Sequence, residues 1–398
     1  MTRLAQSSEL RYEMPLFYPL PDFELCEGCV NVQHGCNCWN CCFRKHDKLA
    51  SDFDLKTFSE HDQQTAHTAI SDYDASNDNY DSEDEFRHWT IQDYLHYYQT
   101  QQLTPYQVAL AIIKAVKHSN NKSTTSTSPP LNAIVAMNEE DILEQARQST
   151  KRYNNAINNT TKQKEELPRL LEGVPVVIKD EVGLKNYPTT QGTTFLASID
   201  GISTKDCLVV QKLKHAGALI VGKSNMHEMG IGTTGFNWSD FGTARNPYNV
   251  HHYTGGSSSG SAAAVAAGFV PLAVGLDGGG SIRIPSSLCG VVGLKPTFSR
   301  GDMDMELCPT LGHIGPIGAS VLDVAIGYAV MAGPFLDDDS NNSTNKKSPP
   351  VHLATFYNNQ NLSDVKIGIY EEYFNDADAE IVETCWKVVK HLESLGKL

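Results

Sequence analysis

Residues 255–296 read GGSSSGSAAAVAAGFVPLAVGLDGGGSIRIPSSLCGVVGLKP, and this stretch governs the architecture of the chain. It contains two serine-centred segments, because Ser257 lies in a Gly/Ser run and Ser281 directly follows three glycines. The apolar run 270–276 between them has the length of a buried strand, and Pro285 suits the first turn of a helix. A strand, a glycine-rich turn and a helix in this order bring backbone N–H groups together at a point that favours negative charge.

Gly/Ser runs in isolation are typical of flexible linkers. Here both runs border Ala- and Val-rich segments, and each is followed by apolar sequence rather than by further polar residues. The pattern therefore predicts tightly packed turns inside a core, not a linker.

A lysine in an apolar context lies upstream, at Lys179 in the segment GVPVVIKD. A serine hydroxyl at neutral pH is a poor nucleophile and needs a base. A lysine serves as that base only when it is neutral, which requires burial or nearby positive charge, and a second serine between the two relays the proton in both directions. The alternative interpretation is a solvated lysine paired with Asp180.

Bulk composition excludes several classes of function. The hydrophobic content of 40% provides for a sizeable core, and the net charge of −15 argues against a nucleic-acid partner. No apolar run reaches the roughly 18 residues that span a bilayer, and the first residues, MTRLAQSSEL, lack the apolar core of a signal peptide. We therefore expect an intracellular protein, either cytoplasmic or peripheral on endomembranes.

The N-terminal region has a different composition from the rest of the chain. Six of the ten cysteines crowd into residues 26–42, and residues 71–86 carry seven acidic side chains. Two CxxC pairs, Cys26 with Cys29 and Cys38 with Cys41, are candidates for a structural zinc site. Redox-active or lipid-modified thiols, or a cysteine-rich tail without a site, remain open. We expect residues 1–88 to be a partly disordered appendage.

Residues 89–398 are predicted to form one α/β domain. The expected elements are helices after Thr90 and Thr104 and at 139–157, 207–216 and 377–395, and strands at 174–178, 218–221, 270–276 and 365–370. This alternation favours a largely buried mixed sheet covered by helices. A final helix normally leads into another strand, so we expect the domain to be incomplete at its C-terminal end.

Three other segments match the consensus sequences of known sites but lack the structural context that those sites need. Residues 217–224 fit a phosphate-binding loop, but the residues between the glycines are apolar and read as the strand itself. Residues 230–235 fit G-x-G-x-x-G without a preceding strand. Ser258 fits a G-x-S-x-G nucleophile elbow, with Asp302 and His313 as partners, but a loop precedes it instead of a strand.

The stretches GVPVVIKDEV, GKSNMHEMGIGTTGFN, GGSSSGSAAA, DGGGSIRIPSSLCGVVGLKPT and GHIGPI resemble the amidase signature family, in the same order along the chain. The resemblance implies the amidase-signature fold, a large mixed β-sheet core covered by helices on both faces, and a Ser–cis-Ser–Lys triad without a catalytic cofactor. Ser281 would be the nucleophile, Ser257 the bridging serine that follows a cis peptide bond, and Lys179 the base. The amides of Gly278, Gly279, Gly280 and Ser281 would form the oxyanion hole, with Ser258, Asp277 and Arg283 as supporting groups.

Within that family, the segments IKDE and PTTQGTTF are most similar to those of the plant-type fatty acid amide hydrolases. The resemblance implies hydrolysis of fatty acid amides such as N-acylethanolamines, peripheral membrane contact and a homodimer. The helices at 90–118, with Tyr94, Tyr97 and Tyr98, are candidates for an apolar entrance, although core packing explains any single one of these tyrosines as well. A general small-amide amidase, the A-type subunit of a glutamine-hydrolysing amidotransferase and an inactive family member are the alternatives.

Overall fold

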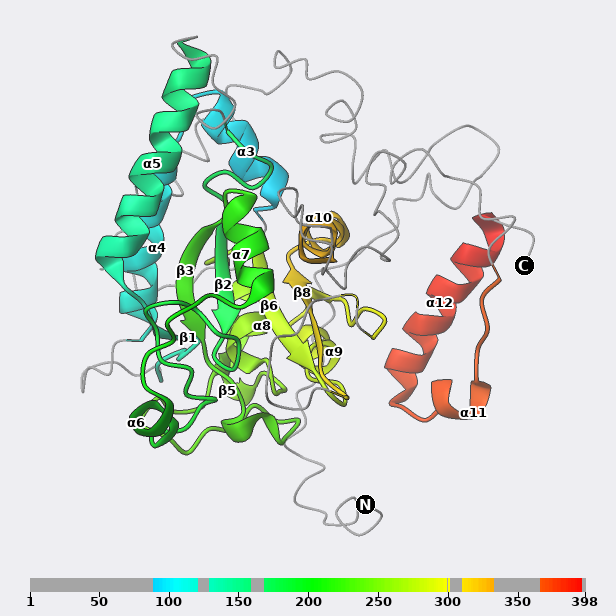
Figure 1. The fold of residues 1–398 in the computed structure, drawn as a ribbon. Coiled ribbons are helices and arrows are strands. Elements are labelled where there is room, and N and C mark those ends of the chain that lie inside the picture. Colours follow the sequence, from blue (N-terminus) through cyan, green and yellow to red (C-terminus); the bar gives the residue numbers. More distant parts are fainter. Residues whose placement is uncertain are drawn as a thin grey trace, which may run out of the picture. The chain divides into compact units, whose positions relative to one another are not determined.

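The fold is described by a computed structural model of residues 89–120, 129–158, 168–298, 300, 310–332 and 366–395. The chain divides into two compact units, residues Met1–Pro21 with Leu55–Val351 and residues Asp22–Asp54 with His352–Leu398. The predicted cysteine site and the acidic segment lie outside the described residues. Figure 1 shows the first unit as a central sheet with helices packed against it.

The largest sheet among the described residues has six strands in the order β1-β3-β2-β6-β8-β7. In that order, the strands are β1 (Ile134–Ala136), β3 (Leu219–Ser224), β2 (Pro175–Lys179), β6 (Leu272–Asp277), β8 (His313–Gly318) and β7 (Val292–Gly293). Strand β2 runs parallel to both β3 and β6, whereas the β1–β3, β6–β8 and β7–β8 pairs are antiparallel. The predicted mixed sheet is therefore confirmed. A separate two-stranded ribbon pairs β4 (Arg245–Asn246) with β5 (Asn249–Tyr253).

The three central strands β2, β3 and β6 are buried along their whole length. Continuous apolar runs are typical of strands covered on both faces, which explains why these runs were recognisable in the sequence. Strand β3 ends at Ser224 and includes Lys223, so the segment that matched a phosphate-binding loop is a strand, as expected. Because β2 and β6 are parallel neighbours, their carboxyl ends meet at one edge of the sheet and bring Lys179 and Asp277 to that edge.

Helices cover both faces of the sheet. They include α3 (Ile91–Gln99), α4 (Pro105–Ser119), α5 (Glu139–Ile157), α6 (Leu196–Asp200), α7 (Leu208–His215), α8 (Ser259–Ala266), α9 (Arg283–Leu288) and α10 (Val321–Ala332), and a short 3₁₀ turn η6 (Glu228–Gly230) follows β3. Side chains alternate between the two faces along a strand. Leu272 of β6 contacts Gly327 of α10, whereas the position of Gly275 faces Ser258 and Ile282, so α10 and α8 lie on opposite faces.

The Gly/Ser run leads into helix α8, which begins at Ser259, and both the run and the helix are buried. The close approach of α8 to the sheet depends on Gly260, where a Cβ atom would lie 2.3 Å from the carbonyl oxygen of Ala133 and 2.4 Å from the amide nitrogen of Asn225. The run is therefore packed inside the core and is not a linker, as predicted.

The two N-terminal helices begin at the predicted caps. Thr90 and Asp93 form the reciprocal hydrogen bonds of a capping box at α3, and Thr104 and Gln107 do the same at α4. The tyrosines of α3 are buried in the interior, where Tyr98 donates a hydrogen bond to the carbonyl oxygen of Gly173 at 3.1 Å. The idea that Tyr94, Tyr97 and Tyr98 contact a membrane interface is wrong, because their rings pack against Trp89, Tyr153 and one another.

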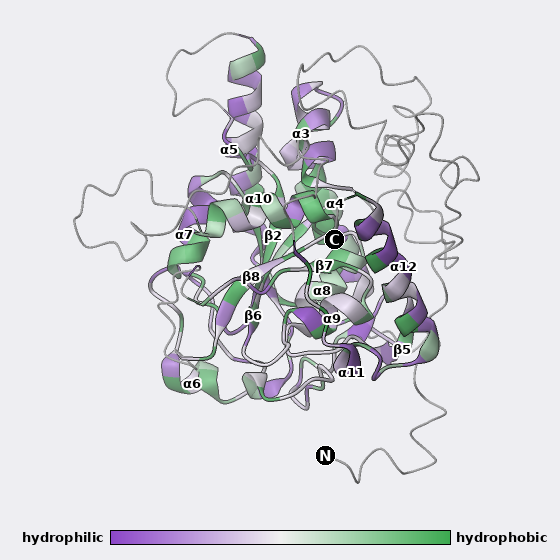
Figure 2. Ribbon diagram, turned by 90° about the vertical axis from the view of Figure 1, so that its right-hand side faces the viewer, coloured by the Kyte–Doolittle hydropathy of each residue, from purple (hydrophilic) through white to green (hydrophobic). Residues whose placement is uncertain are grey.

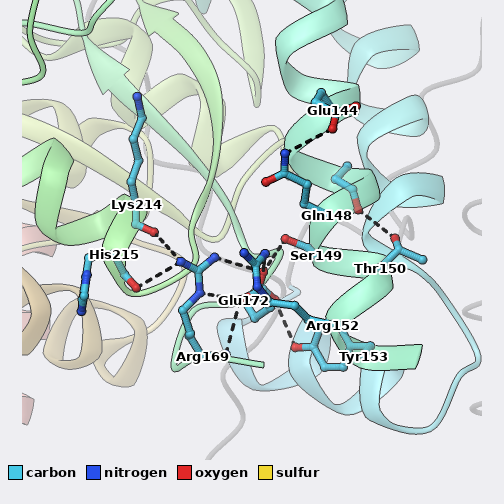
Figure 3. A network of polar contacts seen from close by, with 11 residues as sticks. Glu144, Gln148, Ser149, Thr150, Arg152, Tyr153, Arg169, Glu172, Lys214 and His215 are labelled. Carbon is cyan, nitrogen blue, oxygen red and sulfur yellow. Dashed lines mark hydrogen bonds and ion pairs between the residues drawn. The ribbon is translucent and has the colours of Figure 1, made fainter. Parts of the chain in front are cut away.

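A buried carboxylate holds α5, the turn before β2 and the end of α7 together (Figure 3). Glu172 is fully buried and accepts hydrogen bonds from Ser149 and Arg152 of α5 and from Arg169. Arg169 also donates to the carbonyl oxygen of Lys214 at the C-terminal end of α7. Several charge-assisted bonds offset the cost of burying this carboxylate, so the network fixes the entry into β2.

The described part of the second unit contains α11 (Glu371–Phe374) and α12 (Ala379–Leu395). Trp386 of α12 donates to the side chain of Asn375 at 2.8 Å and packs edge-on against Phe374. Figure 2 shows α12 as largely hydrophilic with hydrophobic residues between. The predicted final helix is confirmed, but the predicted strand at 365–370 is wrong, because residues 366–370 have no strand structure.

No helix of the described residues has the length and apolarity to cross a membrane.

Candidate active site

Two of the predicted site residues meet at the carboxyl edge of the sheet. Lys179 is the last residue of β2, and Ser257 precedes α8. The Nζ of Lys179 donates hydrogen bonds to Ser257 Oγ at 2.7 Å and to the carbonyl oxygen of Leu276 at 3.1 Å. The peptide bond between Gly256 and Ser257 is cis, the geometry that the resemblance implied for the bridging serine.

Lys179 is completely buried, so it is not the solvated lysine of the alternative interpretation. Burial lowers the pKa of its ammonium group, and the carboxylates of Glu181 and Asp277 oppose this effect without reversing it. A lowered pKa favours the neutral amine, which is the form that accepts a proton.

The acidic partner of Lys179 is Glu181 and not Asp180. Glu181 Oε1 lies 2.5 Å from Lys179 Nζ, whereas Asp180 forms an ion pair with Lys223 of β3 at 3.5 Å. The backbone turns directly after β2, where the amide of Val182 donates to the carbonyl oxygen of Lys179, and this turn brings Glu181 back to Lys179. Sequence reasoning missed Glu181, because the apolar run that predicts the strand does not report the turn after it.

Ser281 lies in the turn between β6 and α9, next to open space. Cβ atoms placed on Gly278 and Gly279 would meet no atom within 4 Å. Among the described residues, none accepts a hydrogen bond from the amides of Gly278, Gly279 or Ser281, and none bonds the Ser281 hydroxyl. The backbone N–H of Ser258 donates to the carbonyl oxygen of Ser281 at 3.1 Å, which ties the two serine segments together.

One of the four predicted oxyanion donors, the amide of Gly280, already has an acceptor within the protein. The amide of Gly280 donates to Asp277 Oδ1 at 2.7 Å, so this structure leaves the amides of Gly278, Gly279 and Ser281 for an oxyanion. The motif alone did not reveal this, because the direction of an amide depends on the conformation of the turn.

Asp277 organises the turn that carries Ser281. Its carboxylate accepts hydrogen bonds from the amides of Gly280 and Ile282 and from both Nε and Nη2 of Arg283. Burial raises the pKa of Asp277, but these hydrogen bonds outweigh burial and lower the pKa to about 2. The carboxylate therefore remains charged at neutral pH and holds the turn in place.

Ser258 does not fit the nucleophile-elbow alternative. Its side chain is fully buried, and its Oγ bonds both the carbonyl oxygen and the amide of Leu276 at 3.3 Å. His313, the proposed histidine partner, begins β8 and bonds the carbonyl oxygen of Leu311 through Nδ1. Asp302 lies outside the described residues.

No group of three or more His, Cys, Asp or Glu side chains in the described ranges is arranged to hold a metal ion. The described cysteines, Cys207, Cys289 and Cys385, are not in disulfide bonds. The zinc site predicted at Cys26, Cys29, Cys38 and Cys41 falls outside these ranges and stays a prediction.

The described residues thus form a mixed sheet at whose edge a buried lysine contacts a serine beside a glycine turn. Residues 118–398 match the family model described as Amidase, so the chain belongs to the amidase family.

Relatives from plants and bacteria share much of the sequence. The chain is 39% identical to a fatty acid amide hydrolase of Arabidopsis thaliana over 83% of this chain and 52% of that protein. It is 41% identical to one of Oryza sativa subsp. indica over 75% and 47%. It is 42% identical to the A-type subunit of the glutamyl-tRNA(Gln) amidotransferase of Rippkaea orientalis over 61% and 49%. The chain thus spans about half the length of the curated relatives it matches.

Solved structures show the same fold. The native peptide amidase of Stenotrophomonas maltophilia aligns with a TM-score of 0.56 and 27% identity over 68% of this chain and 52% of that one. A bacterial aryl acylamidase of the amidase signature family aligns with a TM-score of 0.54 and 28% identity, over 61% of this chain and 47% of that one.

Proposed function

We propose that this protein hydrolyses carboxylic amide bonds through an acyl-enzyme on Ser281. The observation that carries the proposal is the 2.7 Å hydrogen bond between Lys179 Nζ and Ser257 Oγ, two side chains that are both buried. A buried lysine in contact with a serine is a base of the kind that a serine nucleophile needs. The open turn at Gly278 and Gly279 supports the proposal, because it leaves space for a carbonyl group beside Ser281.

The proposed reaction begins when Ser281 Oγ attacks the carbonyl carbon of the amide. The proton of Ser281 passes to Ser257, and the proton of Ser257 passes to the neutral amine of Lys179. The C–N bond then breaks, the departing nitrogen takes a proton back along the same path, and an ester remains on Ser281. Water attacks that ester with Lys179 again as the base, which releases the carboxylic acid and restores the hydroxyl.

The amides of Gly278, Gly279 and Ser281 are the proposed donors to the oxyanion of the tetrahedral intermediate. One such donor contributes about 3–4 kcal/mol to transition-state stabilisation when its position is preorganised. The bonds from Asp277 to the turn supply that preorganisation.

Covalent labelling with a fluorophosphonate tests the proposal directly. We expect mass spectrometry to find the adduct on Ser281, and Ser281→Ala to abolish it. Ser258→Ala is the matched control and should still be labelled. An adduct that survives in Ser281→Ala but disappears in Ser258→Ala would mean that the nucleophile is Ser258.

We propose further that the substrates are fatty acid amides. Support comes from the plant relatives, which are named fatty acid amide hydrolases and match 83% of this chain in the case of Arabidopsis thaliana. Support also comes from exposed apolar side chains on the segments 195–202 and 231–238, namely Phe195, Ile199, Ile202, Ile231, Phe236 and Trp238.

These apolar residues belong to segments that contact the site. The amide of His227 donates to the carbonyl oxygen of Ser257, and the amide of Met229 donates to that of Gln191. The segments that carry Phe195 and Trp238 are thus anchored beside Ser257. Exposed apolar side chains on these segments favour an acyl chain and peripheral contact with a lipid surface over a charged substrate.

A chain-length series tests the lipid proposal. We expect kcat/KM to rise from propionamide through N-acylethanolamines of increasing acyl length, because each buried methylene contributes about 0.8 kcal/mol. A preference for the short amides would overturn the lipid assignment and leave the amidase proposal standing.

An A-type subunit of a glutamine-hydrolysing amidotransferase is the second candidate. The 42% identity to the Rippkaea orientalis protein favours it, although that match covers 61% of this chain. This candidate predicts glutamine hydrolysis that depends on partner subunits, so amide hydrolysis by the single purified chain argues against it.

A further inference from the structure

The turn that follows β2 places a second buried charge, Glu181, against Lys179. The two side chains are 0% and 3% exposed, and Lys179 Nζ lies 2.5 Å from Glu181 Oε1. This oxygen is buried and accepts no hydrogen bond of good geometry from any described group, so its contact with Lys179 is an ion pair. A position at Gly230 would bring a Cβ atom 3.2 Å from Glu181 Oε2 and 3.9 Å from Ser257 Oγ, so the carboxylate lies on the same side as the bridging serine.

The nitrogen of Lys179 has three oxygen neighbours, namely Ser257 Oγ, Leu276 O and Glu181 Oε1. An ammonium group carries three protons, and a neutral amine carries two protons and one lone pair. The carbonyl of Leu276 only accepts, so one proton of the amine stays on it. The negative charge of Glu181 attracts the second proton, which leaves the lone pair for the hydroxyl of Ser257.

We propose that Glu181 is a positioning residue that aims the lone pair of Lys179 at Ser257 and balances the positive charge that Lys179 acquires when it takes the proton. This role of Glu181 rests on the proposed function. It names the residue that orients the lone pair of Lys179 and sets the pH range in which Lys179 acts as a base.

Other charged groups face this pair from each neighbouring element. Asp277 at the end of β6 is a second negative charge acting on Lys179, but Arg283 neutralises it at 3.0 Å. Lys223 of β3 interacts with both Asp180 and Glu181, and His227 follows β3 with Lys179 among its neighbours. Glu181 is therefore the one carboxylate in direct contact with Lys179 among the described residues, and its charge should dominate.

The sign of the pH effect follows from the charge. The neutral amine is active, so the rate rises with pH as Lys179 loses its proton. Glu181 stabilises the ammonium and moves this rise to higher pH. Substitution by glutamine keeps an oxygen at the same place and removes the charge, so it moves the rise to lower pH.

The test measures the rate of fluorophosphonate labelling at Ser281, and kcat and KM for an amide, between pH 5 and 10. We expect Glu181→Gln to shift the acidic limb of the profile down by about one pH unit or more. Glu181→Asp keeps the charge but retracts it by one methylene. It should leave the limb in place and lower kcat by about 10-fold with little change in KM, because the lone pair is less well aimed. Glu228→Gln is the matched control, and the acidic limb of its pH–rate profile should stay where it is in the unsubstituted protein.

The outcomes separate this inference from the proposed function. If Ser281 of the unsubstituted protein is labelled but Glu181→Gln leaves the limb unmoved, the role of Glu181 is wrong and the amidase proposal stands. If Glu181→Asp reacts at the full rate, the positioning role is wrong even where Glu181→Gln folds poorly. If Ser281 is not labelled at any pH, the proposed function fails and this inference fails with it.

Discussion

Arg283 binds both carboxylate oxygens of Asp277 across the turn that carries Ser281, with Nε–Oδ2 and Nη2–Oδ1 distances of 3.0 Å each. The two residues are six positions apart, and the ion pair closes the loop between β6 and α9. Paired N–H···O bonds fix orientation as well as distance. The amides of the turn, which are the proposed oxyanion donors, therefore depend for their direction on the Asp277–Arg283 pair.

The first prediction concerns this ion pair. Asp277→Asn should lower the rate of fluorophosphonate labelling at Ser281 by roughly 10²-fold, the cost of one misplaced oxyanion donor. Arg283→Lys should lower it less, since the charge remains and the paired geometry is lost. Arg147→Lys on α5 is the matched control for arginine replacement. Labelling of Asp277→Asn at the full rate would show that the turn holds its shape without the carboxylate.

The second prediction concerns the buried pair of Lys179 and Glu181. Lys179→Met should abolish labelling and also lower the free energy of unfolding by about 3–5 kcal/mol, because Glu181 is left buried without its partner. The double variant Lys179→Met/Glu181→Gln should stay inactive but regain most of that stability. Urea unfolding monitored by circular dichroism measures both effects.

The two variants answer different questions. Stability that is not regained in the double variant would mean that Lys179 stabilises the fold mainly through Ser257 and Leu276. Activity that survives in Lys179→Met would mean that another group is the base.

The sequence was sufficient for the three central strands and for the edge at which Lys179 lies, because both depend on local patterns, whereas β1, β7 and β8 were not predicted. Buried strands such as β2 and β6 read as apolar runs, and the parallel order of neighbouring strands places Lys179 beside Asp277. The same reasoning failed at 365–370, where alternation predicted a strand. A strand also needs a neighbour with which to form hydrogen bonds, and alternation does not report whether one is there.

Details of the site depended on directions that the sequence does not specify. The amide of Gly280 turns inward to Asp277 because of the shape of the turn, so the count of oxyanion donors differed from the motif. The tyrosines of α3 were ambiguous for a similar reason. An aromatic stripe fits a core more often than an interface, and packing against Trp89 and Tyr153 places these rings inside.

The third prediction concerns Asp323, which lies in the first turn of α10 and is fully buried. It accepts a hydrogen bond from the amide of Ile91 at 2.8 Å and another from Ser320, and so joins α3 to α10. Burial raises its pKa to about 7 in spite of these bonds. The folded state therefore favours the protonated acid, whereas the unfolded chain has a pKa of about 3.9.

Because the pKa of Asp323 is higher in the folded than in the unfolded state, the free energy of unfolding falls as the pH rises. The contribution of Asp323 to stability is fully present below about pH 4 and is lost as the pH rises through about 7. Asp323→Asn keeps an acceptor for Ile91 and a donor for Ser320, but it does not titrate. Relative to this variant, the protein with Asp323 should lose on the order of 3 kcal/mol of unfolding free energy between pH 4 and pH 8. Parallel stability curves for the two proteins would contradict the prediction.

The fourth prediction concerns Gly260 in α8, where two effects of opposite sign compete. Replacing glycine by alanine inside a helix normally stabilises it by about 1 kcal/mol. Here the added Cβ would lie 2.3 Å from Ala133 O and 2.4 Å from Asn225 N. Both are backbone atoms, which do not yield as the end of a side chain does, and overpacking costs about 1–3 kcal/mol or more. We therefore expect Gly260→Ala to destabilise the protein.

Gly278→Ala is the matched control for stability, because its Cβ would meet no atom within 4 Å. Its unfolding midpoint in urea should stay within error of that of the unsubstituted protein. An unchanged or raised midpoint for Gly260→Ala would mean that α8 can move away from the sheet, and the close packing described for this helix would then be wrong.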